Sequence, residues 1–230
     1  MPRKTLLLLI LITTLKTYGQ APKLQIGIQT GFAMPTGSFA SGFNLYVDNG
    51  YATTGQNYKL YAEYRLGNTF CVGLNYLYYT NGLEDGNLRS ASNNIYTTNN
   101  ANVLKKSSTQ GVIASLLFKG KETPLFIKGF GGLGVSKTAE IEISNSKESL
   151  MFPQASSLGF ITGLGIGIYL PLKDKWFIEI EADYISSYAK PKNVIVTDKT
   201  GDKTYPQGDI SYNQTVVNIN LGIGFFLLND

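Results

Sequence analysis

Hydrophobic and acidic residues alternate from Ile178 to Tyr184 within WFIEIEADYISSY, which runs from Trp176 to Tyr188. Glu179, Glu181 and Asp183 occupy one set of alternate positions, and mostly apolar side chains occupy the other set. Because successive side chains of an extended strand point to opposite faces, this pattern predicts a β-strand with a charged face and an apolar face. In a soluble sheet the charged face would meet water. In a membrane barrel the apolar face meets lipid and the polar face meets the lumen.

The rest of the chain contains seven more segments that read as strands, so the sequence predicts eight strands in all. One of them, 110–118, is apolar on both faces, and its register stays open. The predicted strands are 24–33, 57–66, 69–79, 110–118, 124–136, 157–170, 176–188 and 214–228.

The connections between these strands are alternately long and short. Long polar links are expected at 34–56, 80–109, 137–156 and 189–213, whereas the three other links are tight turns. Structureless loops of this length are uncommon in a compact soluble domain. Outer-membrane barrels of bacteria combine an even strand number with short periplasmic turns and longer extracellular loops. The sequence therefore predicts an all-β fold, an eight-stranded antiparallel up-and-down transmembrane β-barrel.

Aromatic side chains concentrate near the ends of the predicted strands, as in the aromatic girdles of membrane barrels. The alternative is a core filled with aromatic side chains, because strands of any fold are rich in them. The girdle is predicted from Phe32, Tyr58, Phe70, Tyr76, Tyr78, Tyr79, Phe118, Phe126, Trp176, Tyr184, Tyr188, Phe225 and Phe226.

The N-terminus has the form of a secretory signal peptide. Arg3 and Lys4 precede the apolar run Leu6–Leu15, which is too short for a bilayer that requires roughly 20 residues. Cleavage is expected near Gly19, so residues 1–19 are predicted as the signal peptide and residues 20–230 as a barrel domain. We expect export to the bacterial outer membrane.

Composition restricts the chemistry that this chain can perform. It has no His, which removes the usual general base and the usual metal ligand. The single cysteine, Cys71, permits no intrachain disulfide. The net charge of +4 comes without a basic block that would suggest nucleic acid. We therefore expect no enzyme, no cofactor, no metal site and no nucleic-acid partner.

The predicted signal peptide, the eight strands, the opening segment LQIGIQTGF and the closing segment VNINLGIGFF together resemble the small outer-membrane β-barrel family. This family includes the PorT-type barrels and the transmembrane domain of outer membrane protein A. The resemblance covers the chain after its signal peptide. It implies a membrane-embedded barrel, and the PorT-type likeness would allow a role as an accessory subunit of a secretion apparatus.

If the apolar faces point to lipid, several charged side chains must share a narrow lumen. Buried charges without partners are costly, so we expect these residues to form an internal salt-bridge network. An eight-stranded barrel is just wide enough for side chains to fill. The network could be a structural core, a gated ion path or a small-ligand site. Its predicted members are Lys59, Glu63, Arg65, Lys128, Glu179, Glu181 and Asp183.

Function is expected to be structural or based on surface interactions. The expected partners are outer-membrane lipid, lipopolysaccharide and an envelope protein that binds through the extracellular loops, since loops on a rigid scaffold carry binding. Within the second long loop, 95–103 could add to a strand above the membrane. The alternatives are the secretion subunit, a narrow channel for ions or small solutes, and a soluble exported lipocalin-like barrel with an apolar ligand cavity.

Overall fold

The structure is a computed structural model of the chain. It describes residues 24–41, 52–67, 69–84, 100–119, 124–145, 148–172, 175–192, 194–198, 204–208 and 212–227. The predicted signal peptide, residues 1–19, lies outside the described residues.

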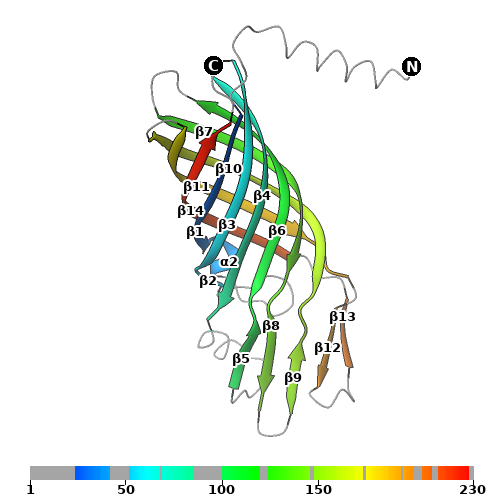
Figure 1. Cartoon of the computed structure of the whole chain (residues 1–230). Coiled ribbons are helices and arrows are strands. Elements are labelled where there is room, and N and C mark those ends of the chain that lie inside the picture. The colour runs from blue at the N-terminus through cyan, green and yellow to red at the C-terminus, as the bar shows by residue number, and fades with distance from the viewer. Residues whose placement is uncertain are drawn as a thin grey trace, which may run out of the picture.

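Eight long strands form a closed antiparallel barrel. Each of these strands pairs with the next one along the chain, and β14 pairs with β1 to close the barrel. Figure 1 shows the strands running obliquely side by side. The predicted eight-stranded antiparallel barrel is confirmed. Its strands are β1 (Leu24–Pro35), β3 (Gly55–Leu66), β4 (Phe70–Leu83), β6 (Ser107–Lys119), β7 (Leu125–Lys137), β10 (Ser156–Pro171), β11 (Trp176–Ala189) and β14 (Tyr212–Phe226).

The barrel has an apolar outer surface and a polar middle section inside. On β10, Phe160 is 67% exposed and Leu164 is 68% exposed. On β11, Glu179, Glu181 and Asp183 are each 1% exposed. The alternation seen in the sequence therefore becomes an outer and an inner face, with the charges inside, which is the polarity of a transmembrane barrel.

Short connections join β3 to β4, β6 to β7 and β10 to β11 at one end of the barrel. The first of these begins at Gly67, whose φ of 70° lies in the left-handed region. Glycine enters this region without the steric penalty of a Cβ atom, so the chain can reverse directly after Leu66. This end of the barrel is called the turn end below.

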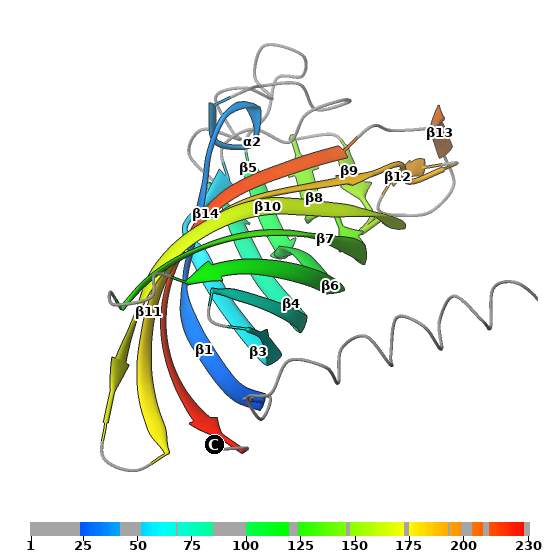
Figure 2. The ribbon, with the colours of Figure 1, turned by 90° about the horizontal axis from the view of Figure 1, so that it is seen from above.

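The connections at the opposite end contain more structure than the sequence predicted. Parts of three of the segments predicted as long loops form a second, five-stranded antiparallel sheet in the order β13-β12-β9-β8-β5. Figures 1 and 2 both show these strands gathered beyond one end of the barrel. The predicted addition of a strand from 95–103 falls partly on β5. The strands are β5 (Asn100–Lys105), β8 (Glu140–Ser144), β9 (Ser149–Phe152), β12 (Val194–Asp198) and β13 (Thr204–Gly208).

One apolar cluster joins the second sheet to the barrel. On β8, Ile141 and Ile143 face inward, and they belong to the same buried cluster as Leu77 and Ile185 of the barrel wall. Phe39 of the short helix α2 (Ser38–Ser41) is 1% exposed and completes this cluster together with the two-residue strand β2 (Ala52–Thr53). The segments that connect the barrel strands at this end can form a sheet because these apolar side chains give the sheet a buried core.

The predicted aromatic girdle is wrong at three positions. Tyr79 is 0% exposed and Phe126 is 1% exposed, and both point into the barrel. Phe226 also lies on the inner face, where its ring packs on the buried Phe177, with ring centres 4.8 Å apart. Each follows or precedes an outward residue directly, so nearness to a strand end does not decide the face; the alternation does. Most of the other predicted girdle residues are exposed, including Trp176 and Tyr184.

Candidate functional site

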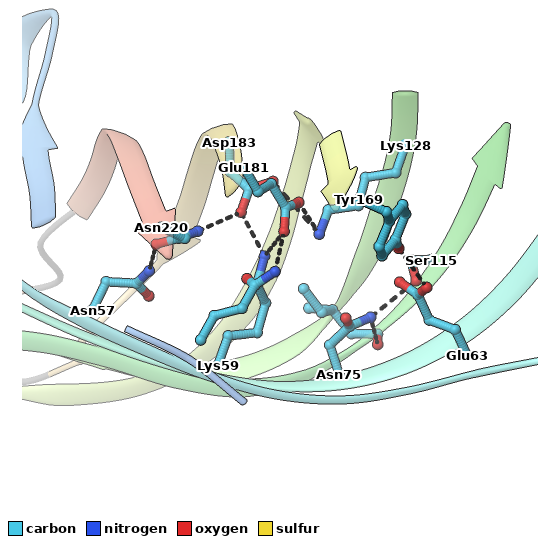
Figure 3. Close-up of polar contacts among 12 residues, drawn as sticks. Asn57, Lys59, Glu63, Asn75, Ser115, Lys128, Tyr169, Glu181, Asp183 and Asn220 are labelled. Atoms are coloured by element: carbon cyan, nitrogen blue, oxygen red, sulfur yellow. Dashed lines mark hydrogen bonds and ion pairs between the residues drawn. The ribbon is translucent and has the colours of Figure 1, made fainter. Parts of the chain in front are cut away.

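The centre of the lumen holds a cluster of four charged side chains. Lys59 of β3 reaches across the lumen to β11, with β1 and β14 between these strands in the barrel wall. Its Nζ lies 2.7 Å from Glu181 Oε2 and 2.7 Å from Asp183 Oδ2. All three side chains are at least 98% buried. Figure 3 shows the lysine and the two acids pointing toward one another.

Lys128 of β7 contacts the same two acids from the other side. Its Nζ pairs with Glu181 Oε1 and lies 3.7 Å from Asp183 Oδ1. In the barrel wall β10 separates β7 from β11, so the four charges connect three strands that are not neighbours. Two positive and two negative charges balance formally. Such a cluster stabilises a fold only when its geometry is good and further hydrogen bonds complete it. It is called the central cluster below.

Amide side chains supply those further hydrogen bonds. Gln29 Nε2 donates to Glu181 Oε2 at 2.8 Å, and Asn220 Nδ2 donates to Asp183 Oδ2 at 3.2 Å. Asn57 in turn donates to the side-chain oxygen of Asn220 (Figure 3). These donors come from β1, β14 and β3, so the cluster ties together more of the barrel wall than its ion pairs do alone.

A second group of polar side chains surrounds Glu63, nearer to the turn end. Tyr169 donates its hydroxyl hydrogen to Glu63 Oε2 at 2.9 Å, and Gln25 donates to the same oxygen. Lys119 Nζ lies 3.7 Å from Glu63 Oε2 and donates to Gln25 Oε1 at 3.0 Å. The same ammonium group lies 3.8 Å from the centre of the Tyr169 ring, within the range of a cation–π contact.

Two of the predicted charged residues stand apart from these groups. Glu179 is 1% exposed, and its Oε2 has no hydrogen-bond partner among the described residues. Arg65 is half-buried near the turn end, and its Nε likewise has no partner within the described part of the chain. No ion pair between described residues includes either of them. The structure thus brings Lys59, Lys128, Glu181 and Asp183 together, and places Glu63 in a separate group.

Side chains also fill the lumen on both sides of these groups. Toward the second sheet, the hydroxyl of Tyr79 lies 3.0 Å from Ser187 Oγ, and Thr109 Oγ1 lies 2.9 Å from Ser136 Oγ. The apolar cluster of the barrel mouth follows. Toward the turn end, Cys71, Leu117 and Phe126 pack together against Tyr169. The described side chains therefore fill the barrel in layers along its axis, as expected for eight strands.

Glycines on the inner face make room for the long charged side chains. A Cβ atom at Gly165 of β10 would overlap Asp183 Oδ1 and would lie 3.1 Å from Lys128 Cε. A Cβ atom at Gly27 of β1 would overlap the ring of Tyr61. The inward glycines of these strands thus leave the space that the large side chains on other strands occupy.

Several members of these groups were not among the predicted site residues. Lys119 ends β6, whose register the sequence left open, and its inward direction follows once Leu117 is placed inside. Gln25 and Gln29 alternate with apolar residues in the first predicted strand, but an uncharged amide gave no sign of binding a carboxylate. Alternation was the signal that could have found all three residues.

Among the described residues, no set of three His, Cys, Asp or Glu side chains is placed to hold a metal ion. No helix in the described ranges is both long enough and apolar enough to span a membrane.

Among known proteins, this chain is similar only to solved structures. No protein-family model matches the chain, and no curated protein matches it. Neisserial surface protein A is 10% identical with a TM-score of 0.45, over 90% of this chain and 99% of that one. OprG from Pseudomonas aeruginosa is 12% identical with a TM-score of 0.48, over 90% of this chain and 97% of that one.

A major outer membrane protein from Thermus thermophilus is 13% identical with a TM-score of 0.49, over 90% of this chain and 100% of that one. At these identities and scores, the likeness is a likeness of fold. The assignment of this chain as a barrel rests on its own strand pairing.

Proposed function

We propose that this protein is an integral, non-enzymatic β-barrel protein of the bacterial outer membrane, with a lumen closed by its own side chains. One observation carries the proposal: large apolar side chains cover the outside of the barrel, while paired charges lie inside it. Leu164 is 68% exposed, whereas Glu181 on the adjacent strand is 1% exposed.

The apolar surface has the height that a membrane requires. On β14 and at Leu227 directly after it, the outward residues from Val217 onward are all apolar. At roughly 3.3 Å per residue and a tilt of about 40°, this span rises roughly 25 Å, close to the apolar band of about 25 Å in outer-membrane barrels. A patch of this size on a protein in water would be a strong aggregation hazard.

A structural or surface-interaction role fits the interior better than catalysis does. The acids of the central cluster are bound to lysines and amides, and the chain has no His to act with them as a base. The second sheet offers a folded platform beyond the barrel, where an envelope protein could bind. Membrane lipid and lipopolysaccharide are the proposed partners of the barrel wall, and residues 1–19 are proposed as the signal for export.

Three alternatives differ in how well they fit. A narrow channel would need a path through the central cluster and the apolar layers on both sides of it. A soluble lipocalin-like barrel is less supported, because its polar surface would have to face water and its interior would have to be apolar. A secretion-apparatus subunit fits the fold as well as any other surface role does, and pull-down from envelope extracts would test it.

Fractionation of the cell envelope tests the proposal. The protein should remain in the outer-membrane pellet after a urea wash, and its electrophoretic mobility in detergent should shift on boiling, because a closed barrel stays compact until heated. Recovery in the soluble fraction, with the same mobility before and after boiling, would overturn the proposal.

A further inference from the structure

The outer face of the barrel is hollowed on one side. A groove of about 790 Å³ crosses the strands β11, β14, β1, β3, β4 and β6, which are successive in the barrel wall. This volume falls in the range of roughly 300–1,000 Å³ that is typical of small-molecule sites. Its outward-facing lining is apolar and includes Ile26, Leu60, Leu74, Trp176 and Phe225.

The hollow has a local cause in the sequence. Ala62 of β3 lies between Ile26 of β1 and Leu74 of β4 in the strand register. It is the smallest of the outward side chains that line the groove. The longer side chains of Ile26 and Leu74 therefore extend further from the barrel wall than Ala62 does, and Ala62 forms the bottom of the groove.

A positive charge lies at one end of this groove. Trp176 and Phe225 line the end formed by β11 and β14, where their ring centres are 4.9 Å apart. The exposed Lys175 places its Nζ 5.9 Å from the centre of the Phe225 ring. The groove is apolar and ends at an aromatic pair and a lysine. It is therefore complementary to a molecule with a long apolar chain and an anionic head.

We propose that this groove retains one phospholipid, with an acyl chain over Ala62 and an anionic head group at Lys175. The lipid belongs to the leaflet at the turn end, because Lys175 lies in the connection between β10 and β11. A second copy of the barrel fits less well, because its apolar outer wall would leave the charge of Lys175 unmatched. This inference rests on the proposed membrane location.

Trp176 allows a direct test, since it is the single tryptophan of the chain and lines the groove. The full-length mature protein would be inserted into phosphatidylcholine vesicles that contain a small fraction of lipid with brominated acyl chains, which quench tryptophan fluorescence on contact. Brominated phosphatidylglycerol, which is anionic, should quench Trp176 more than the same fraction of brominated phosphatidylcholine does.

Two variants and one control assign this excess quenching to the groove. Ala62→Phe fills the bottom of the groove and should abolish the excess quenching by the anionic lipid. Lys175→Gln removes the positive charge and should also abolish this excess. Ala182→Phe is the matched control, because Ala182 is also outward-facing but lies outside the groove. It should keep the excess. If Ala62→Phe does not fold, as judged by its mobility before boiling, the exposed Lys175 still provides the test.

The possible outcomes separate the two proposals. Equal quenching by both lipids in the unaltered protein, or an excess that survives in a folded Ala62→Phe variant, overturns the lipid site. Excess quenching that disappears as the ratio of protein to lipid rises would assign the groove to a second copy instead. Absence of quenching by either lipid would overturn the membrane location itself, and the lipid site with it.

Discussion

Lys59 and Asp183 meet in the centre of the barrel, 2.7 Å apart, although they are far apart in sequence and lie on strands that do not pair. The wall strands are held by backbone hydrogen bonds between neighbours. This contact, in contrast, crosses the lumen. Together with the pairing of Lys128 and Glu181, it links opposite walls and fills the space between them.

Replacing Lys59 by methionine should strongly destabilise the barrel. Glu181 and Asp183 would stay buried after losing one of their two cations, and removing one partner of a buried ion pair costs about 3–5 kcal/mol. Urea unfolding in lipid vesicles, followed by Trp176 fluorescence, measures the change. Lys105→Met is the matched control, because Lys105 pairs with Glu140 at 2.6 Å on the surface. It should cost about 0–1 kcal/mol. Equal losses in both variants would contradict a structural role for the central cluster.

A double-mutant cycle should show that Lys59 and Asp183 act as a pair. Asp183→Asn and Lys59→Met should each destabilise the protein, and the double variant should lose less than the sum of the two. Residues that share one network typically couple by roughly 0.5–3 kcal/mol. Unfolding free energies of the four proteins give the coupling directly, and additive losses would show that the observed contact is not energetically important.

The inner face should tolerate added bulk poorly. Gly165→Ala places a methyl group against Asp183 and Lys128 and should cost about 1–3 kcal/mol by overpacking. Gly129→Ala serves as control, because its Cβ atom would meet Leu164 Cδ2 at an ordinary 3.7 Å. The same unfolding measurement compares the two variants. Similar stability of both would mean that Gly165 is not needed to make room in the lumen.

Much of the barrel follows from alternation alone. Each of the eight predicted strands overlaps a barrel strand. In most of them the period of two is repeated over many residues, because one set of side chains faces apolar surroundings and the other set faces the polar lumen. The directions of Lys59, Glu63, Lys128, Glu181 and Asp183 follow from the same pattern. Tyr79, Phe126 and Phe226 were misplaced where nearness to a strand end was used instead of the alternation.

The partners of these charges could not be predicted, because contacts across a lumen depend on the stagger of strands around the barrel. Lys59 lies opposite Gln29 and Leu77 in its neighbouring strands, yet it pairs with acids on β11. Arg65 alternates correctly but lies too close to the turn end to reach them. The second sheet was missed because its strands are short, although Ile141 and Ile143 alternate with polar residues in β8.

The second sheet should unfold without the barrel. Ile143→Asp would put a charge into the apolar cluster, where Ile143 is 4% exposed, and should open the sheet to proteases around residues 138–155. Ser144→Asp, one position along on the other face, should not. Limited proteolysis with mass spectrometry locates the cuts, and the boiling-dependent mobility reports on the barrel. Loss of that shift in Ile143→Asp, while Ser144→Asp keeps it, would show that the two sheets are one cooperative unit.

The closed lumen should block ions. In planar lipid bilayers the purified protein should produce no steady single-channel current at neutral pH, while an open-lumen porin measured in the same chamber does. Stepwise currents that scale with protein concentration would favour the channel alternative over the structural role.

Photo-cross-linking at two tyrosines tests the central claim most directly. Tyr184 is 53% exposed on the outside of β11, and Tyr79 is 0% exposed inside β4. Azidophenylalanine, which resembles tyrosine in size, would replace each one in turn in intact cells. Mass spectrometry after illumination should find lipid adducts at position 184 and cross-links within the chain at position 79. Lipid adducts at neither position, with Tyr184 joined to other residues of the protein, would mean that the apolar face is a core and that the barrel does not stand in the membrane.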